Sequence, residues 1–135
     1  YNYKGTVHSY NKDITEAIKQ FMTAVRIAKE VNMKTEVVNE YNYALLMALK
    51  KDRLTYEPIL NEAFEYGYSF SDEDLKIINL SFIASTYLDK TYSLDSSKRD
   101  EISKRMSDLY GEDWQLSTKE LAAKLDAEYS LRNPK

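Results

Sequence analysis

Residues 5–24 read GTVHSYNKDITEAIKQFMTA, and residues 44–63 read ALLMALKKDRLTYEPILNEA. Each stretch begins with a small residue and has apolar residues 12, 16 and 19 positions later: Gly5, Ala17, Phe21 and Ala24 in the first, and Ala44, Tyr56, Leu60 and Ala63 in the second. With a break after the small residue, this spacing predicts two antiparallel helices that approach closely at that residue. The two start points lie 39 residues apart, a period typical of helical solenoids.

The apolar periodicity and the helix-start signals predict seven helices. They are expected at about residues 1–10, 13–31, 35–50, 55–67, 71–89, 96–111 and 117–131. Asp13, Ser71 and Ser117 each precede an acidic residue by three positions, a spacing typical of a capping box at a helix start. Pro58 would fall in the first turn of the fourth helix, where its missing N–H costs little, and Gly67 would end that helix.

A third copy of the pattern can be placed if its spacing is allowed to shift. Ala84 lies 40 residues after Ala44, but the matching apolar triplet comes six residues late, at Ile102, Met106 and Leu109. We attribute the delay to a six-residue insertion between the two helices of that repeat. The last helix then has no partner, as expected for a capping helix. The sequence thus predicts one all-α domain over residues 1–135. Its repeats would span about 1–31, 35–67 and 72–111, and its capping helix 117–131.

The residue types that most catalytic and metal sites need are scarce. The chain has no Cys and a single His, His8, so a Ser–His pair has at most one candidate base. Zinc sites need several Cys or His ligands, and the three Gly are isolated, unlike those of a phosphate-binding loop. We therefore predict a non-enzymatic protein with no catalytic residues, no metal and no cofactor. A buried pair of catalytic carboxylates stays open, although acids at helix starts normally act as caps.

Charge and hydropathy argue against nucleic-acid and membrane partners. The net charge is −3 and the isoelectric point is near 5.3, so no overall positive field attracts nucleic acid. No apolar run approaches the ~18 residues of a membrane-spanning helix. We expect a cytoplasmic protein. Because the chain begins with Tyr1 and not with Met, we interpret it as a piece of a longer protein.

The first two copies of the pattern resemble the tetratricopeptide repeat. The match rests on Tyr1, Gly5, His8, Ala17, Phe21 and Ala24 in the first copy, and on Ala44, Tyr56, Leu60 and Ala63 in the second. His8 stands where the family prefers Tyr, Tyr56 stands where it prefers Ala, and the period exceeds the family's ~34 residues. The resemblance is to longer-helix versions found in bacterial regulators and scaffolds. It implies a right-handed α-solenoid of about three antiparallel helix pairs. The alternative is a plain antiparallel helical bundle whose spacing matches by chance.

In tetratricopeptide arrays the first helix of each pair lines a concave groove that takes a peptide or a partner helix. The resemblance places this groove at Asn2, Thr6, Ser9 and Tyr10, then Tyr41, Asn42, Leu45 and Leu49, then Ser81, Ser85, Leu88 and Asp89. An Asn amide can donate to and accept from a peptide backbone, and Tyr offers rigid contact area. For each residue the alternative is packing against a neighbouring helix. The cations with which chaperone-adaptor members hold a C-terminal carboxylate are missing, so that ligand class is not expected.

We consider three functions for this sequence. The first is a non-enzymatic module that binds a protein or peptide. The second is a sensor or oligomerisation domain of a bacterial signalling or transcription-regulating protein whose effector domain lies upstream, which leaves a homo-oligomer open. The third is a small enzyme, for which the residue types above give no support.

Overall fold

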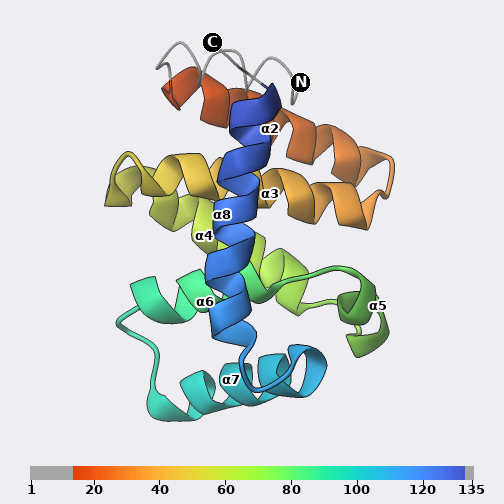
Figure 1. Cartoon of the computed structure of the whole chain (residues 1–135), viewed down its shortest axis with the longest axis vertical. Helices are drawn as coiled ribbons and strands as arrows, with labels where there is room; N and C mark the ends of the chain where they lie inside the picture. Colours follow the sequence, from red (N-terminus) through yellow and green to blue (C-terminus); the bar gives the residue numbers. More distant parts are fainter. Residues whose placement is uncertain (1–13, 133–135) are drawn as a thin grey trace.

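The computed structural model describes residues 14–132, except for the side chains of residues 117 and 129–132. These residues form seven helices and no strand (Figure 1). The helices are α2 (Ile14–Glu30), α3 (Lys34–Leu49), α4 (Arg53–Tyr68), α5 (Asp72–Ile77), α6 (Ser81–Lys90), α7 (Ser96–Tyr110) and α8 (Trp114–Arg132). The all-α prediction is therefore confirmed for this part of the chain. The helix predicted at 1–10 and the Asp13 cap lie outside the described residues.

From α2 to α6 the long helices pack in the order in which the chain makes them. α2 and α3 form an antiparallel pair, α4 packs on α3, and α6 packs on α4 (Figure 1). α5 and α6 both contact α7, which lies at the bottom of the view. The last helix departs from this order, because α8 packs on α6 and α7 and also reaches back to α3. The solenoid winding and its handedness remain predictions.

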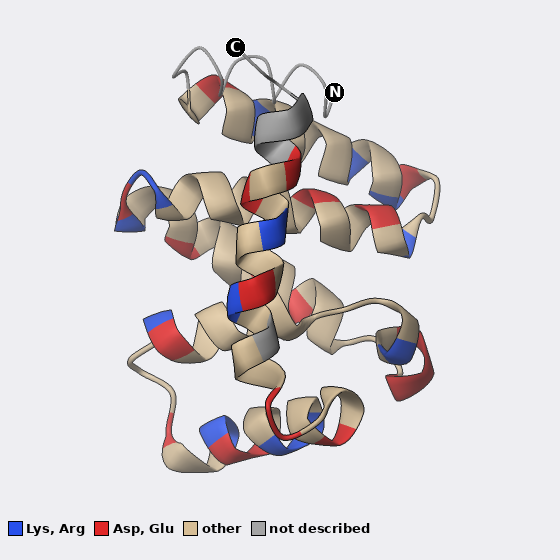
Figure 2. Cartoon of the chain, viewed as in Figure 1, with Lys and Arg blue, Asp and Glu red and all other residues tan. Residues whose placement is uncertain are grey.

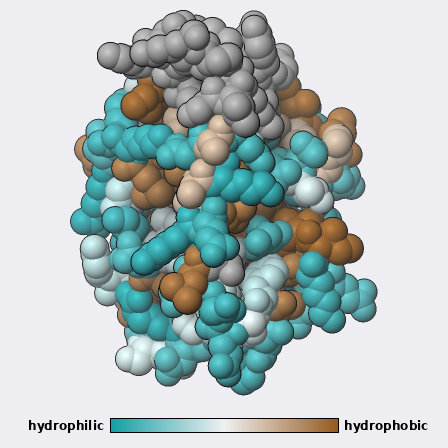
Figure 3. Space-filling model, in the orientation of Figure 1, coloured by the Kyte–Doolittle hydropathy of each residue, from teal (hydrophilic) through white to brown (hydrophobic). Residues whose placement is uncertain are grey.

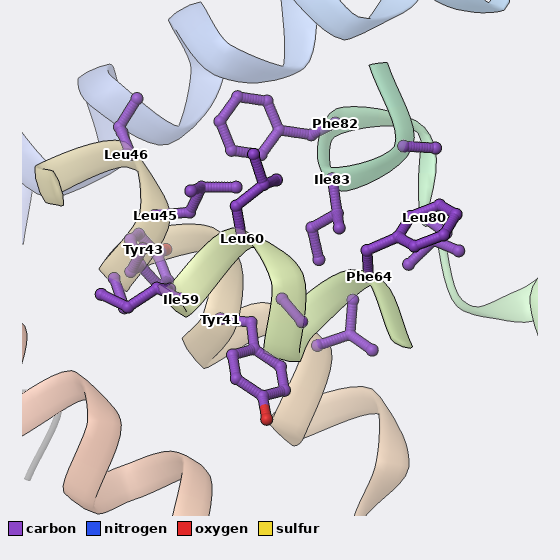
Figure 4. Packing of buried hydrophobic residues seen from close by; sticks show 14 of the residues in the cluster. Tyr41, Tyr43, Leu45, Leu46, Ile59, Leu60, Phe64, Leu80, Phe82 and Ile83 are labelled. Carbon is purple, nitrogen blue, oxygen red and sulfur yellow. The ribbon is translucent and has the colours of Figure 1, made fainter. Parts of the chain in front are cut away.

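α3 lies at the centre of the hydrophobic core. Every residue from Tyr41 to Ala48 is buried, so this helix is enclosed around its whole circumference. Leu45 meets Leu60 of α4 and Ile83 of α6 in the middle of the core (Figure 4). Ala44, the small residue of the second repeat copy, is fully buried, as its predicted role requires.

Three predicted helix boundaries are wrong, each because a local contact was missed. α4 begins at Arg53 because Asp52, and not a later residue, accepts a hydrogen bond from the Thr55 amide at 2.9 Å. Gly67 lies inside α4, where it is buried against Leu80, and a side chain at that position would overlap the Leu80 methyl group. Trp114 begins α8, so Ser117 lies within that helix and does not start it.

The helix predicted at 71–89 is divided into α5 and α6. Ser71 does cap its start, since the Ser71 hydroxyl accepts from the Asp74 amide at 3.2 Å. The helix then stops at Ile77, and the next one starts at Ser81, whose amide is held by the Asn79 side chain at 2.8 Å. Asn favours such local bonds to the backbone, and these compete with a continuous helix.

Tyr110 of α7 satisfies backbone groups that this break leaves unpaired. Its hydroxyl lies within hydrogen-bond distance of two carbonyl acceptors, at 2.6 Å from the Leu75 oxygen and 2.9 Å from the Ile78 oxygen. The same hydroxyl accepts a hydrogen bond from the Leu80 amide at 3.1 Å. Burial raises the pKa of the Tyr110 phenol, which keeps it protonated and able to donate. A single side chain thus closes the α5–α6 junction.

Two arginines attach α7 to the rest of the protein in a similar way. Arg99 donates to the carbonyl oxygens of Leu88 and Thr91, at the end of α6. Arg105 donates to the carbonyl oxygens of Tyr68 and Phe70, at the end of α4. Helix C-termini carry carbonyls without intrahelical partners, so each arginine both caps a helix and fixes α7.

Replacing Tyr110 by Phe should lower the free energy of unfolding by about 1–3 kcal/mol, because backbone groups at the α5–α6 junction lose their partner. Urea denaturation measures this change. The matched control is Tyr92→Phe, at an exposed tyrosine, which should change stability little.

The stability difference between the native chain and Tyr110→Phe should shrink as the pH rises above about 10, where an unfolded tyrosine ionises. Tyr110 must stay protonated in the folded state, so its raised pKa contributes stability below that pH and loses it above. A difference that is constant up to pH 11 would argue against the bridging role.

Candidate functional site

Tyr41, which the resemblance placed in the groove, lies in the core between α2 and α4. Its hydroxyl donates to Glu62 of α4 at 2.6 Å, and its ring lies 5.8 Å from that of Tyr66. The Lys29 ammonium of α2 lies 5.2 Å from the centre of the Tyr41 ring. Burial, and then the bond to Glu62, raise the pKa of this phenol. The groove assignment of Tyr41 is therefore wrong, because the side chain is committed to holding α2, α3 and α4 together.

Three further predicted groove residues also pack inside the protein. Leu45 and Ser81 are fully buried, and Leu49 is packed against the core. For these residues the packing alternative is correct. The first-repeat set, Asn2, Thr6, Ser9 and Tyr10, lies outside the described residues.

Ser85, Leu88 and Asp89 line a cleft of about 680 Å³ between α6, α7 and the start of α8, and their assignment to a peptide groove stays a prediction. Three polar side chains of the cleft are engaged within the protein: Thr86 and Thr118 donate to carbonyls of their own helices, and Arg99 caps α6. The cleft therefore offers surface for contact but no convergent set of groups that would drive a reaction.

The structural feature that sequence reasoning missed is the position of α8. It lies over Leu46 of α3 and Phe82 of α6, which point toward it (Figure 4). Both side chains are buried beneath it. We name this side of α3 and α6, represented by Tyr43, Leu46, Lys50 and Phe82, the α8-binding face.

α8 meets this face with one side only. The residues that it directs inward recur at alternating steps of four and three: Trp114, Thr118, Leu121, Leu125 and Glu128. This is helical spacing, and three of the five inward residues are apolar. The exposed side of α8 alternates acidic and basic residues (Figure 2), and the protein surface on this face is mostly hydrophilic (Figure 3).

The contact between α8 and α3 is polar at its margins. The Tyr43 hydroxyl donates to Glu128 at 2.9 Å, and the Lys50 ammonium pairs with Asp126 at 2.9 Å. The Lys50 and Asp126 side chains are 45% and 52% exposed. Such an exposed pair contributes at most about 1 kcal/mol. A cavity of about 270 Å³ remains between the two helices, lined by Glu36, Asn39, Glu40, Tyr43, Leu121, Lys124, Leu125 and Glu128.

Within residues 14–132 the side chains at this site make packing contacts, hydrogen bonds and ion pairs. No three acidic or histidine side chains of that part of the chain come together as a metal ion would require. None of the helices described there combines the length and apolarity needed to cross a bilayer.

Comparisons with protein families, with curated proteins and with solved structures found no match. The tetratricopeptide resemblance thus rests on the spacing of residues alone.

Asn42 of α3 is a buried polar residue whose replacement by an apolar one should change the stability of the protein. The side chain is only 5% exposed, and its amide oxygen has no hydrogen-bond partner among the described residues. Leaving such an oxygen unpaired costs about 1–3 kcal/mol. Asn42→Leu, which is similar in volume, should therefore raise the free energy of unfolding by about 1 kcal/mol or more. Guanidinium denaturation would measure it, with Asn61→Leu at an exposed position as the control. A loss of stability would mean that the oxygen is bonded in solution.

Proposed function

We propose that this protein is a non-enzymatic protein-interaction module that binds a helical partner segment on the α8-binding face. The observation that carries the proposal is that a helix, α8, already lies on this face over the buried Leu46 and Phe82 (Figure 4). Helix-in-groove recognition uses the same geometry, in which apolar residues at i, i+3, i+4 and i+7 enter a hydrophobic surface.

The composition of the chain agrees with a binding role. It has no Cys and one His, and the polar groups around the cleft cap helices or bond to their own backbone. Binding needs only a surface with apolar anchors and a polar margin. The α8-binding face has both, with Leu46 and Phe82 as apolar anchors and Tyr43 and Lys50 at the margin.

A binding test must allow for the resident helix. Only residues 111–113 separate α7 from α8, and so short a tether gives α8 an effective concentration on the order of millimolar. A partner added in trans therefore competes poorly against it. Weakening α8 within the intact chain should expose the face to a partner.

The test uses a fluorescent peptide with the sequence of residues 114–132 and the full chain carrying Leu125→Asp, which places a carboxylate in the buried seam of α8. Fluorescence anisotropy should show the peptide binding to this variant and binding much more weakly to the native chain. Adding Leu46→Asp on the face itself should weaken binding about tenfold or more, since a buried leucine is worth about 1.5–3 kcal/mol.

The matched control adds Leu54→Asp, at a leucine that is 89% exposed and remote from the α8-binding face, and it should leave the affinity unchanged. Circular dichroism checks that each variant keeps its helices. If the peptide fails to bind the folded Leu125→Asp chain, the face does not accept a helix in trans and the proposal is wrong.

A further inference from the structure

The two halves of α8 are held with different strength. The first half is anchored by Trp114 and Thr118, which are both buried near α6 and α7. In the second half, Leu125 is the only buried side chain among those described. Leu121 and Ala122 pack partly buried against the core, and the polar contacts of this half are with Tyr43 and Lys50. Among the described side chains, the second half of α8 thus has fewer fully buried anchors than the first.

A pocket beneath the second half of α8 also favours its replacement by another helix. A pocket of about 270 Å³ lies between α3 and α8 and opens to solvent at Glu36, Asn39 and Lys124, so the resident helix leaves part of this face uncovered. A different helix with larger or better placed side chains has contacts to gain there.

The two ends of the contact between α8 and α3 differ in charge. Acidic residues lie along the first half of α3, here called the acidic flank, and basic residues lie beyond its C-terminal end, here called the basic flank (Figure 2). Glu36 and Glu40 of α3 line the cavity on the acidic flank, and α8 adds Glu128 and Lys124 there. On the basic flank, Lys50 meets the acidic Asp126. α8 thus matches the basic flank, whereas on the acidic flank it brings one carboxylate and one ammonium, so Glu36 and Glu40 still leave more acidic than basic groups around the pocket.

We propose that the partner is an amphipathic helix that displaces the second half of α8, with an acidic residue opposite Lys50 and basic residues on the flank of Glu36 and Glu40. This inference rests on the proposed function and specifies its ligand. In terms of α8, the partner keeps apolar residues at the places of Leu121 and Leu125 and an acid at that of Asp126. It carries Lys or Arg where α8 has Glu128. In the absence of the partner, α8 occupies the α8-binding face, and a helix that matches this face better displaces it.

A basic residue at that place can be accommodated locally. The Tyr43 hydroxyl, which donates to Glu128, can equally accept a hydrogen bond from an ammonium group. The exchange therefore removes a like charge from the acidic flank and leaves the Tyr43 oxygen a hydrogen-bond partner.

The experiment compares three peptides of residues 114–132 on the full chain carrying Leu125→Asp. They are the native sequence, Glu128→Lys and Asp126→Lys. Glu128→Lys should bind about two- to fivefold more tightly than the native peptide, and Asp126→Lys about two- to fivefold more weakly. Adding Lys50→Glu to the chain should reverse the preference between Asp126→Lys and the native peptide. All differences should shrink in 1 M salt, where charges are screened within about 3 Å.

Failure of the inference and failure of the proposed function give different results. Equal affinities, or the reverse order, with the native peptide still binding would overturn the charge pattern alone. No binding by any peptide would overturn the proposed function and the inference together.

A second measurement does not depend on loosening α8. Glu128→Lys in the otherwise native chain should hold the resident helix more firmly, so amide exchange over residues 121–128 should slow about two- to fivefold. Lys124→Glu, which adds a carboxylate to the same flank, should speed it. Unchanged or faster exchange in Glu128→Lys would contradict the inference.

Discussion

The fold depends on the enclosure of α3. Eight consecutive residues of this helix, 41–48, are buried, and such a helix must be covered on every side. α2, α4 and α6 pack against three sides, and α8 covers the rest. If α8 left, the core side chains Tyr43, Leu46 and Phe82 would meet water. Fully burying one such side chain is worth about 1.5–3 kcal/mol, so the face needs an occupant.

The need to cover the α8-binding face links the stability of the fold to the proposed function. Among the described side chains, the second half of α8 is held by buried Leu125, by Leu121 and Ala122 at the edge of the core, and by a polar margin. By contrast, α7 is held by Arg99, Arg105 and Tyr110, each of which bonds to several backbone groups. On the proposed function, the protein combines a fixed support with a cover that can be exchanged.

Sequence periodicity was sufficient for most helices and insufficient for their assembly. The 3.6-residue repeat of apolar residues predicted α2, α3 and α7 to within a few residues, and Ser71 capped its helix as expected. The break between α5 and α6 was missed because apolar residues continue through it. Its signal was the single residue Asn79, whose side chain holds the next helix start. Gly67 was misread because a buried glycine and a terminal glycine look alike in sequence.

The residues of a binding groove were harder to predict than the helices, for a physical reason. Spacing says which residues share a helix side, but it does not say which neighbour covers that side. Tyr41 turned inward to Glu62, and α8 covers a different side of α3, that of Tyr43, Leu46 and Lys50. The inward stripe of α8 could be read from Trp114, Thr118, Leu121 and Leu125, yet nothing in that stripe reveals whether it meets α6 alone or α3 as well.

The most direct test of the central claim follows the position of α8 itself. Because the chain has no Cys, Ala123→Cys on the exposed side of α8 gives a unique attachment point for a nitroxide. Paramagnetic broadening in solution should affect the amides of α3 around Tyr43 and Lys50. In the chain that also carries Leu125→Asp, where the resident helix competes less, saturating Glu128→Lys peptide should remove any such broadening while the signals near Trp114 stay broadened. Absence of broadening on α3 in the free protein, or broadening that persists with the peptide bound, would contradict the account.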